Sequence, residues 1–164
     1  SALIPEVRAR FKDLAALNRQ LGMTALFQNH SPSGSNPYLG GDLTDMKALM
    51  EGFSPDEIAV AFDLGHAIVV HKDEWKMHFD KLKPHLGIAY IKDADRVKRM
   101  VPFGEGEFSR TDFFQQLKAT GYRRPFSIHI EYEWVEKGKP KTRDALLGAL
   151  KQSRQAVLKW CAAA

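Results

Sequence analysis

The stretch that decides the fold is residues 58–67, Ile-Ala-Val-Ala-Phe-Asp-Leu-Gly-His-Ala. Its apolar run is typical of a buried strand and ends in Asp63, Gly65 and His66, with the next helix expected about eight residues later. In parallel α/β sheets, ligands bind at the carboxyl ends of the strands. The stretch therefore predicts a strand that carries Asp63 and His66 to a site. The alternative is that Asp63 caps a turn and His66 packs locally.

The composition indicates an ordinary globular protein. The chain has 164 residues, 44% hydrophobic and 27% charged, which is enough for one domain with a real core. No apolar run is long enough to span a bilayer and no segment has the layout of a signal peptide, so we expect no membrane partner. The single cysteine, Cys161, excludes an internal disulfide and favours a cytoplasmic location. The formal net charge of +4 suits an anionic small ligand as well as nucleic acid.

Helical and strand patterns alternate along the chain. Helices are predicted over 3–21, 42–52, 75–86 (broken near Pro84), 111–119 and 142–161. Strands are predicted over 23–30, 58–64, 88–93 and 126–133, with a very short candidate around 101–103 and a charged loop over 136–141. This alternation predicts right-handed βαβ units and a parallel sheet.

One face of each predicted strand turns polar toward its end. A strand between two helix layers should be apolar on both faces, whereas a barrel strand points one face at a central axis that opens into a site. The alternative is scattered polar residues at sheet edges. A complete eight-stranded barrel needs about 250 residues. We therefore predict that 1–164 is a single domain, the C-terminal part of a (β/α)8 barrel whose first strands are missing or come from another chain. A self-contained small α/β fold is the alternative.

The polar face collects carboxylates and imidazoles on separate strands, a composition that suits a divalent-metal site or an acid/base site. The set comprises Gln28, His30, Asp63, His66, Tyr90, Lys92, His129, Glu131 and Glu133.

These motifs resemble the xylose isomerase-like TIM barrels, the sugar phosphate isomerase/epimerase family. The matching pieces, in order, are Gln28-Asn29-His30-Ser31, Phe62-Asp63-Leu64-Gly65-His66-Ala67, Ile91-Lys92-Asp93, Phe103-Gly104-Glu105-Gly106-Glu107 and Ser127-Ile128-His129-Ile130-Glu131-Tyr132-Glu133. The resemblance makes the visible strands the fourth to the eighth of the barrel.

The resemblance also implies a divalent metal ion, Mn, Mg, Co or Zn, held by Glu, Asp, His and Glu on strands four, five, six and eight. Asp63 and Glu131 match this set, whereas Gln28 replaces the first glutamate and Tyr90 the histidine. A neutral amide binds a divalent ion more weakly than a carboxylate, and a phenol with a pKa near 10 is a poor ligand at pH 7. Two of the four ligand positions are thus altered.

The candidate roles follow from this comparison. Catalytic candidates are Glu131, Lys92 and His66; substrate-binding candidates are Gln28, His30, Tyr90, Glu133 and Arg96; metal-binding candidates are Asp63 and Glu131. Lys92 is alternatively a structural partner of Asp63 or Glu131. The lysines and arginines after the third and last strands are either anion-recognition groups or a solvated surface. The loop at Gly104 either covers a substrate or is only a tight turn.

The resemblance favours a sugar or sugar-phosphate isomerase or epimerase of carbohydrate metabolism, with a small-molecule substrate. A lyase or dehydratase using Lys92 or His66, and a non-catalytic carbohydrate-binding barrel, are the alternatives. Abasic-site endonucleases share this barrel, but residues 92–108 contain no histidine, so we do not expect a nucleic-acid substrate. We expect a homo-oligomer, or completion by an N-terminal half.

Overall fold

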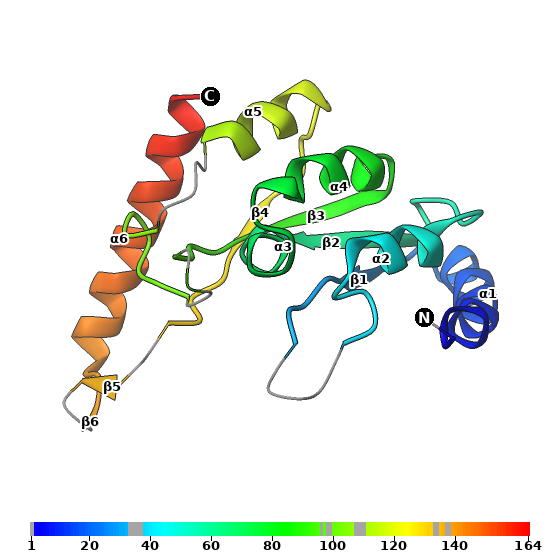
Figure 1. The fold of residues 1–164 in the computed structure, drawn as a ribbon, viewed down its shortest axis with the longest axis horizontal. Coiled ribbons are helices and arrows are strands. Elements are labelled where there is room, and N and C mark those ends of the chain that lie inside the picture. Colours follow the sequence, from blue (N-terminus) through cyan, green and yellow to red (C-terminus); the bar gives the residue numbers. More distant parts are fainter. Residues whose placement is uncertain are drawn as a thin grey trace. The chain divides into compact units, whose positions relative to one another are not determined.

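The helices and strands alternate through most of the chain, as the sequence predicts (Figure 1). The structure is a computed structural model that describes residues 2–32, 38–95, 97, 100–106, 111–132, 135–136 and 139–164. These residues fall into two compact units, Ser1–Tyr90 with Arg124–Ser127, and Ile91–Arg123 with Ile128–Ala164. That the whole chain is a single domain stays a prediction.

The first unit contains most of the elements. They are α1 (Ile4–Leu21), β1 (Ala25–Gln28), α2 (Leu43–Met50), β2 (Ile58–Asp63), α3 (Leu64–His71), the 3-10 turn η1 (Lys72–Glu74), α4 (Trp75–Leu82), the 3-10 turn η2 (Lys83–His85), β3 (Leu86–Ile91) and β4 (Phe126–Ile128). The last residues of β3 and β4, Ile91 and Ile128, already belong to the second unit. That unit also holds α5 (Thr111–Ala119), β5 (Val135–Glu136), β6 (Lys139–Pro140) and α6 (Arg143–Ala162).

The sheet confirms the predicted α/β fold. Its four parallel strands lie in the order β1-β2-β3-β4, the order in which they occur along the chain. A doubly wound sheet reverses its strand order at a switch point, whereas a barrel adds each new strand beside the last. This order is therefore that of a partial TIM barrel. All six residues of β2 are buried, because the strand has a neighbour on both sides.

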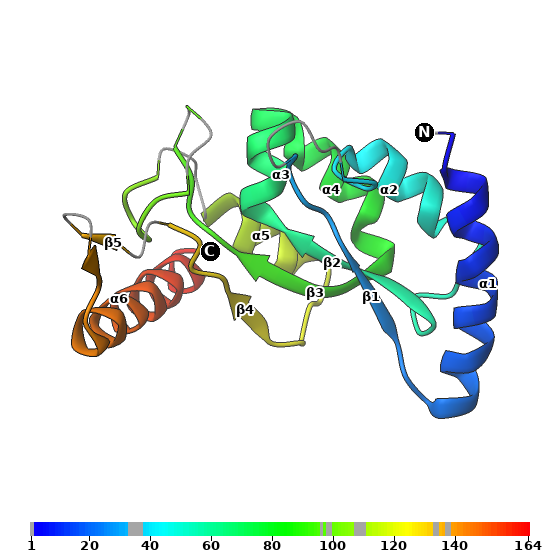
Figure 2. The same cartoon turned by 90° about the horizontal axis from the view of Figure 1, so that it is seen from below.

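Helices α2, α3 and α4 cover one face of the sheet in the first unit (Figure 2). Phe62 of β2 packs edge-on against Phe79 of α4, with ring centroids 4.9 Å apart. On β1, Phe27 likewise packs against Phe11 of α1 at 5.5 Å. These aromatic contacts fix the face that β1 and β2 turn to the helices. Period-two alternation then puts Gln28 and Asp63 on the opposite face.

A close approach of β1, β2 and β3 occurs at Gly87. A Cβ atom built on Gly87 would lie 2.3 Å from Cδ2 of Leu26 and 2.9 Å from Cβ of Ala59. The register between β2 and β3 shifts beside this point, between Val60 and Ala61. Glycine is required here because no side chain fits between the strands. The side chain it meets, Leu26, remains 44% exposed.

The start of α3 corrects the sequence prediction. After the predicted strand 58–64, no helix was expected before residue 75, yet α3 begins at Leu64, directly after β2. The reason is that Asp63 is its N-cap: Asp63 has extended backbone angles, and its Oδ1 accepts a hydrogen bond from the His66 backbone N–H at 3.2 Å. The alternative interpretation, in which Asp63 caps a local turn, was right on this point.

Other boundaries agree with the prediction only in part. The helix predicted over 75–86 is broken near Pro84, as expected: α4 ends at Leu82 and the 3-10 turn η2 follows, because proline has no backbone N–H to donate. Strand β1, Ala25–Gln28, is shorter than the strand predicted over 23–30. Strand β3, Leu86–Ile91, begins and ends two residues before the strand predicted over 88–93. The last strand ends at Ile128, so the polar residues that follow it lie beyond the sheet.

In the second unit, the short strand around 101–103 does not form. An isolated antiparallel bridge joins Ala94 to Met100 instead. The loop predicted over 136–141 contains most of a small hairpin, in which β5 pairs with β6. Phe103 stacks on Trp160 of α6, with ring centroids 5.9 Å apart. Among the described residues, no helix combines the length and apolar composition needed to cross a membrane.

Candidate functional site

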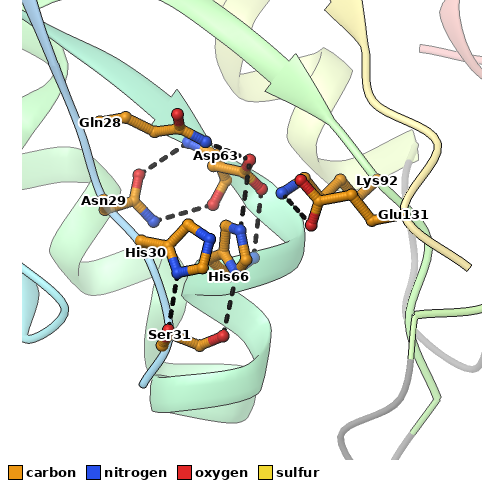
Figure 3. Close-up of polar contacts among 8 residues, drawn as sticks. All are labelled: Gln28, Asn29, His30, Ser31, Asp63, His66, Lys92 and Glu131. Atoms are coloured by element: carbon orange, nitrogen blue, oxygen red, sulfur yellow. Dashed lines mark hydrogen bonds and ion pairs between the residues drawn. The ribbon is translucent and has the colours of Figure 1, made fainter. Parts of the chain in front are cut away.

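The carboxyl ends of β1 and β2 are tied together by Asn29. Its Oδ1 accepts a hydrogen bond from the Asp63 backbone N–H at 2.7 Å, and its Nδ2 donates to the Asp63 backbone carbonyl at 2.9 Å (Figure 3). The Asn29 side chain is buried, so both bonds are shielded from water. The amide therefore continues the hydrogen-bonding of the sheet past the end of β1 and fixes Asp63 relative to residues 28–30.

The Asp63 carboxylate is fully buried and is held by N–H groups of the first unit. Its Oδ2 accepts a hydrogen bond from Gln28 Nε2 at 3.0 Å, and its Oδ1 accepts the capping bond from the His66 backbone. His66 Nε2 lies 3.9 Å from Oδ2, beyond hydrogen-bonding distance. Burial of a carboxylate is costly unless such donors compensate it.

Two imidazoles lie beside this carboxylate. The rings of His30 and His66 have centroids 3.8 Å apart and are tilted by 35°. Ser31 contacts both: its carbonyl oxygen lies 2.7 Å from His30 Nδ1, and its Oγ lies 2.9 Å from His66 Nδ1 (Figure 3). His66 is buried and His30 is half-buried, with Tyr38 packed against its ring at 4.6 Å. Imidazoles are the side chains best suited to proton transfer near neutral pH.

The structure brings together the candidates of the first unit. Gln28, His30, Asp63 and His66 meet at the ends of β1 and β2. Tyr90 is the register partner of Asp63 on β3 and is half-buried. The sequence prediction that strand ends gather these side chains therefore holds within this unit.

The candidates of the second unit form an ion pair. Lys92 Nζ lies 2.7 Å from Glu131 Oε2 (Figure 3). Lys92 is 1% exposed, whereas the Glu131 side chain is 41% exposed. This direct contact supports the alternative role for Lys92, as a structural partner of Glu131. Arg96 and Glu133 lie outside the described residues.

The loop at Gly104 is held by a buried carboxylate next to Lys92. Asp93 Oδ2 accepts hydrogen bonds from the backbone N–H groups of Gly104 at 2.8 Å and Gly106 at 3.1 Å, and its Oδ1 accepts from Ala94 at 2.9 Å. Gly104 has a φ of 99°, which glycine adopts readily. These amides are engaged within the chain, which favours the tight-turn interpretation of the loop over the substrate-covering one.

The residues present do not fit a divalent ion at the four positions that the resemblance assigns. Gln28 directs its N–H donors, and not its carbonyl, at the Asp63 carboxylate. The Lys92 ammonium occupies an oxygen of Glu131 and would repel a second cation. Tyr90 supplies only a phenol. We therefore base the chemistry of this site on its own side chains.

Sequence reasoning missed two residues of the site, Asn29 and Ser31. The period-two alternation of a strand places Asn29 on the face opposite Gln28 and the other candidates. Its side chain can bond to the Asp63 backbone only because β1 ends at Gln28. Ser31 begins a loop rich in Ser, Gly, Pro and Asn, where nothing distinguishes one polar residue from another. The signal that could have found both is the uninterrupted run of polar residues 28–31 directly after a strand.

The fold of this chain is similar to that of several solved structures. A search of curated proteins finds no match to the chain. An apo 3-keto-D-glucoside 4-epimerase from E. coli superimposes with a TM-score of 0.65 at 16% identity, over 96% of this chain and 52% of that one. A D-tagatose 3-epimerase-like protein gives 0.62 at 17% identity, over 94% and 57%. A sugar phosphate isomerase/epimerase from Parabacteroides distasonis gives 0.61 at 14% identity, over 97% and 53%.

This chain thus spans about half the length of those structures, and at such identities the likeness shows the fold. The sequence model of one family, described as xylose isomerase-like TIM barrel, matches residues 2–153. Since this match covers most of the sequence and the sheet has the strand order of a barrel, the chain belongs to the xylose isomerase-like TIM barrel family.

Proposed function

We propose that the chain acts on a sugar or sugar phosphate as an isomerase or epimerase, by moving a proton next to a carbonyl group. The observation that carries the proposal is the cluster of Asp63, His30 and His66 at the carboxyl ends of two adjacent barrel strands. This is where barrel enzymes place their catalytic groups. The names of the structural neighbours, which include epimerases, agree with this class of reaction.

The reaction needs one group to take a proton from the carbon beside the carbonyl and another to return it. We propose His66 and Glu131 as these groups. An imidazole is effective for this at neutral pH. The Glu131 carboxylate offers oxygen atoms as a base, and Lys92 Nζ lies 2.7 Å from its Oε2. Gln28, His30, Tyr90 and Glu133 would bind hydroxyl groups of the substrate, and Arg96 a phosphate.

The proposal is tested by incubating the protein in D2O with a panel of aldoses, ketoses and their phosphates. Isomerisation or epimerisation through proton transfer exchanges the hydrogen beside the carbonyl for deuterium, which NMR detects at a defined carbon. His66→Gln and Glu131→Gln should each lower the exchange rate by about 100-fold or more. His85→Gln is the matched control, because His85 lies in the first unit and its Nε2 contacts the Phe53 carbonyl oxygen, away from the cluster. The proposal would be refuted if no sugar in the panel gave either deuterium exchange or a product.

A non-catalytic carbohydrate-binding barrel is the second candidate. The hydrogen bond from Gln28 to Asp63 favours it, because a glutamine cannot act as a base. In that case a sugar should raise the melting temperature without conversion. Mass spectrometry of the same incubations separates both candidates from a dehydratase, whose product would be lighter by one water.

We further propose that the chain associates through β1. This strand is at the edge of the described sheet, and Leu26 on it is 44% exposed. An open strand edge pairs readily with another strand. The partner is either a second copy of the chain or further barrel strands. Sedimentation showing a monodisperse monomer would exclude the homo-oligomer.

A further inference from the structure

We propose that Ser31 and Asp63 together hold the two imidazoles in opposite tautomers, so that His30 presents an unprotonated Nε2 while His66 keeps its proton on Nε2. The proposal deepens the proposed function, because it names the nitrogen that faces a substrate hydroxyl or proton. It rests on hydrogen-bonding chemistry at Ser31, which touches His30 through its backbone and His66 through its side chain.

The tautomer of His30 follows from its partner. A backbone carbonyl oxygen only accepts hydrogen bonds, so the short 2.7 Å contact between the Ser31 carbonyl and His30 Nδ1 requires a hydrogen on Nδ1. In the neutral imidazole the other nitrogen then carries the lone pair. His30 is half-buried, so its Nε2 acts as an acceptor for a ligand hydroxyl or proton.

The tautomer of His66 follows from the carboxylate beside it. Asp63 Oδ2 lies 3.9 Å from His66 Nε2, in a place where both side chains are almost completely buried. A lone pair on Nε2 would face that negative charge, whereas an N–H dipole would be attracted to it. The proton therefore belongs on Nε2. His66 Nδ1 is left as an acceptor, and the Ser31 hydroxyl at 2.9 Å donates to it.

The two halves of this arrangement respond differently to mutation. Ser31→Ala removes the hydroxyl that contacts His66 and leaves the carbonyl that contacts His30. Ser31→Thr keeps both groups. Because only one of the two contacts depends on the side chain, the arrangement predicts an effect on one histidine and not the other. A residue that merely stabilised the loop would not produce this asymmetry.

The experiment is long-range 1H–15N correlation NMR of the uniformly 15N-labelled chain at about pH 8, where imidazoles are neutral. Signals are assigned by comparison with His30→Gln and His66→Gln. We expect His30 to be protonated on Nδ1 and His66 on Nε2. In Asp63→Asn, which removes the charge beside His66 Nε2 and keeps a capping side chain, His66 should become a mixture of both tautomers while His30 is unchanged. In Ser31→Ala the Nδ1 signal of His66 should shift because its hydrogen bond is lost, and Ser31→Thr should restore it. Ser54→Ala, which removes a hydroxyl that accepts a hydrogen bond from the Asp56 backbone N–H, should change neither.

The same tautomer on both histidines, or an unchanged His66 tautomer in Asp63→Asn, would overturn the proposal. So would a His30 that changes together with His66, since that would indicate general loosening of the loop; backbone amide spectra of each variant confirm that it folds. This test needs no substrate. A failure of the sugar incubations would thus refute the proposed function and leave the tautomer assignment standing, and the reverse holds equally.

Discussion

Asn29 and Asp63 are joined by two hydrogen bonds that run in opposite directions between one side-chain amide and one peptide backbone, at 2.7 and 2.9 Å. Asn29 thereby sets the position of Asp63 without touching its carboxylate. The carboxylate remains available to Gln28 and to the first turn of α3. The most deeply buried group of the site is thus positioned by a residue that does no chemistry itself.

Asn29→Ala should lower the free energy of unfolding by about 2–4 kcal/mol, because it leaves a buried N–H and a buried carbonyl without partners. The measurement is urea denaturation. Asn18→Ala is the matched control: the Asn18 side chain donates a hydrogen bond to the Glu57 carbonyl at 2.7 Å, just before β2. It should cost about 1 kcal/mol. Equal losses in the two variants would contradict the two-way role of Asn29.

Gly87→Ala should destabilise the chain by about 1–3 kcal/mol, since its Cβ would meet Leu26 and Ala59. Adding Leu26→Ala should recover part of the loss by removing the closer obstacle. Gly148→Ala serves as the control, because this position in α6 has open space around it and should gain about 0.5–1 kcal/mol. A Gly87→Ala loss that Leu26→Ala fails to reduce would place the clash elsewhere.

Asp93→Asn should release the Gly104 loop, because one end of the new amide is an N–H that cannot accept from the backbone donors around it. We expect hydrogen exchange of the Gly104 and Gly106 amides to accelerate by about tenfold or more. Asp95→Asn, at the exposed bond to the Val97 amide, is the comparison that should leave these two amides unchanged. Unaltered exchange in Asp93→Asn would show that the loop is held by other contacts.

Gln28→Glu should raise the affinity for Mn2+ by about tenfold or more, because it places a second carboxylate beside Asp63 and hard cations prefer carboxylate ligands. Calorimetric titration measures this. Adding Asp63→Asn should abolish the gain, and asparagine still caps α3. Asp63→Ala is a poorer choice, since it removes the cap as well. Tight binding of Mn2+ by the unaltered chain would contradict our interpretation of the site.

Stability should fall as the pH drops below about 6.5, because the half-buried His71 and the buried His78 must become charged. Burial and the neighbouring His78 lower the pKa of His71, against the weaker pull of Asp42 and Glu74; burial and Lys81 lower the pKa of His78, against the same two acids. The unfolded chain then binds more protons than the folded one. The stability present above the unfolded pKa is lost as the pH falls through the lowered folded values.

Melting temperatures between pH 7.5 and 5 measure this effect. His71 Nε2 accepts a hydrogen bond from the Leu43 backbone N–H at 3.1 Å, which requires the unprotonated nitrogen. The double variant His71→Gln/His78→Gln should therefore melt with less dependence on pH, whereas His85→Gln should follow the parent chain. An equally steep fall in the double variant would assign the pH dependence to other groups.

The sequence was sufficient for the fold class and for much of the site, for a physical reason. The apolar run of β2 and the polar residues after it are local features, and parallel strands bring their carboxyl ends to one edge. Gln28, His30, Asp63 and His66 could be grouped on that basis. What pattern reasoning could not supply was the helix start at Leu64, because a buried helix entered directly from a strand continues the same apolar run. Nor could it supply Ser31, whose role depends on the distance between two rings.

The N-cap formed by Asp63 limits what an aspartate at this position can reveal about other chains of the family. A family member that no longer acts on sugars would still need a carboxylate at this position, because the carboxylate caps the first turn of α3. Surveys that separate active members from inactive ones by this aspartate would therefore miscount. The residue at position 28 is the more informative marker, because it bonds to the carboxylate and caps no helix.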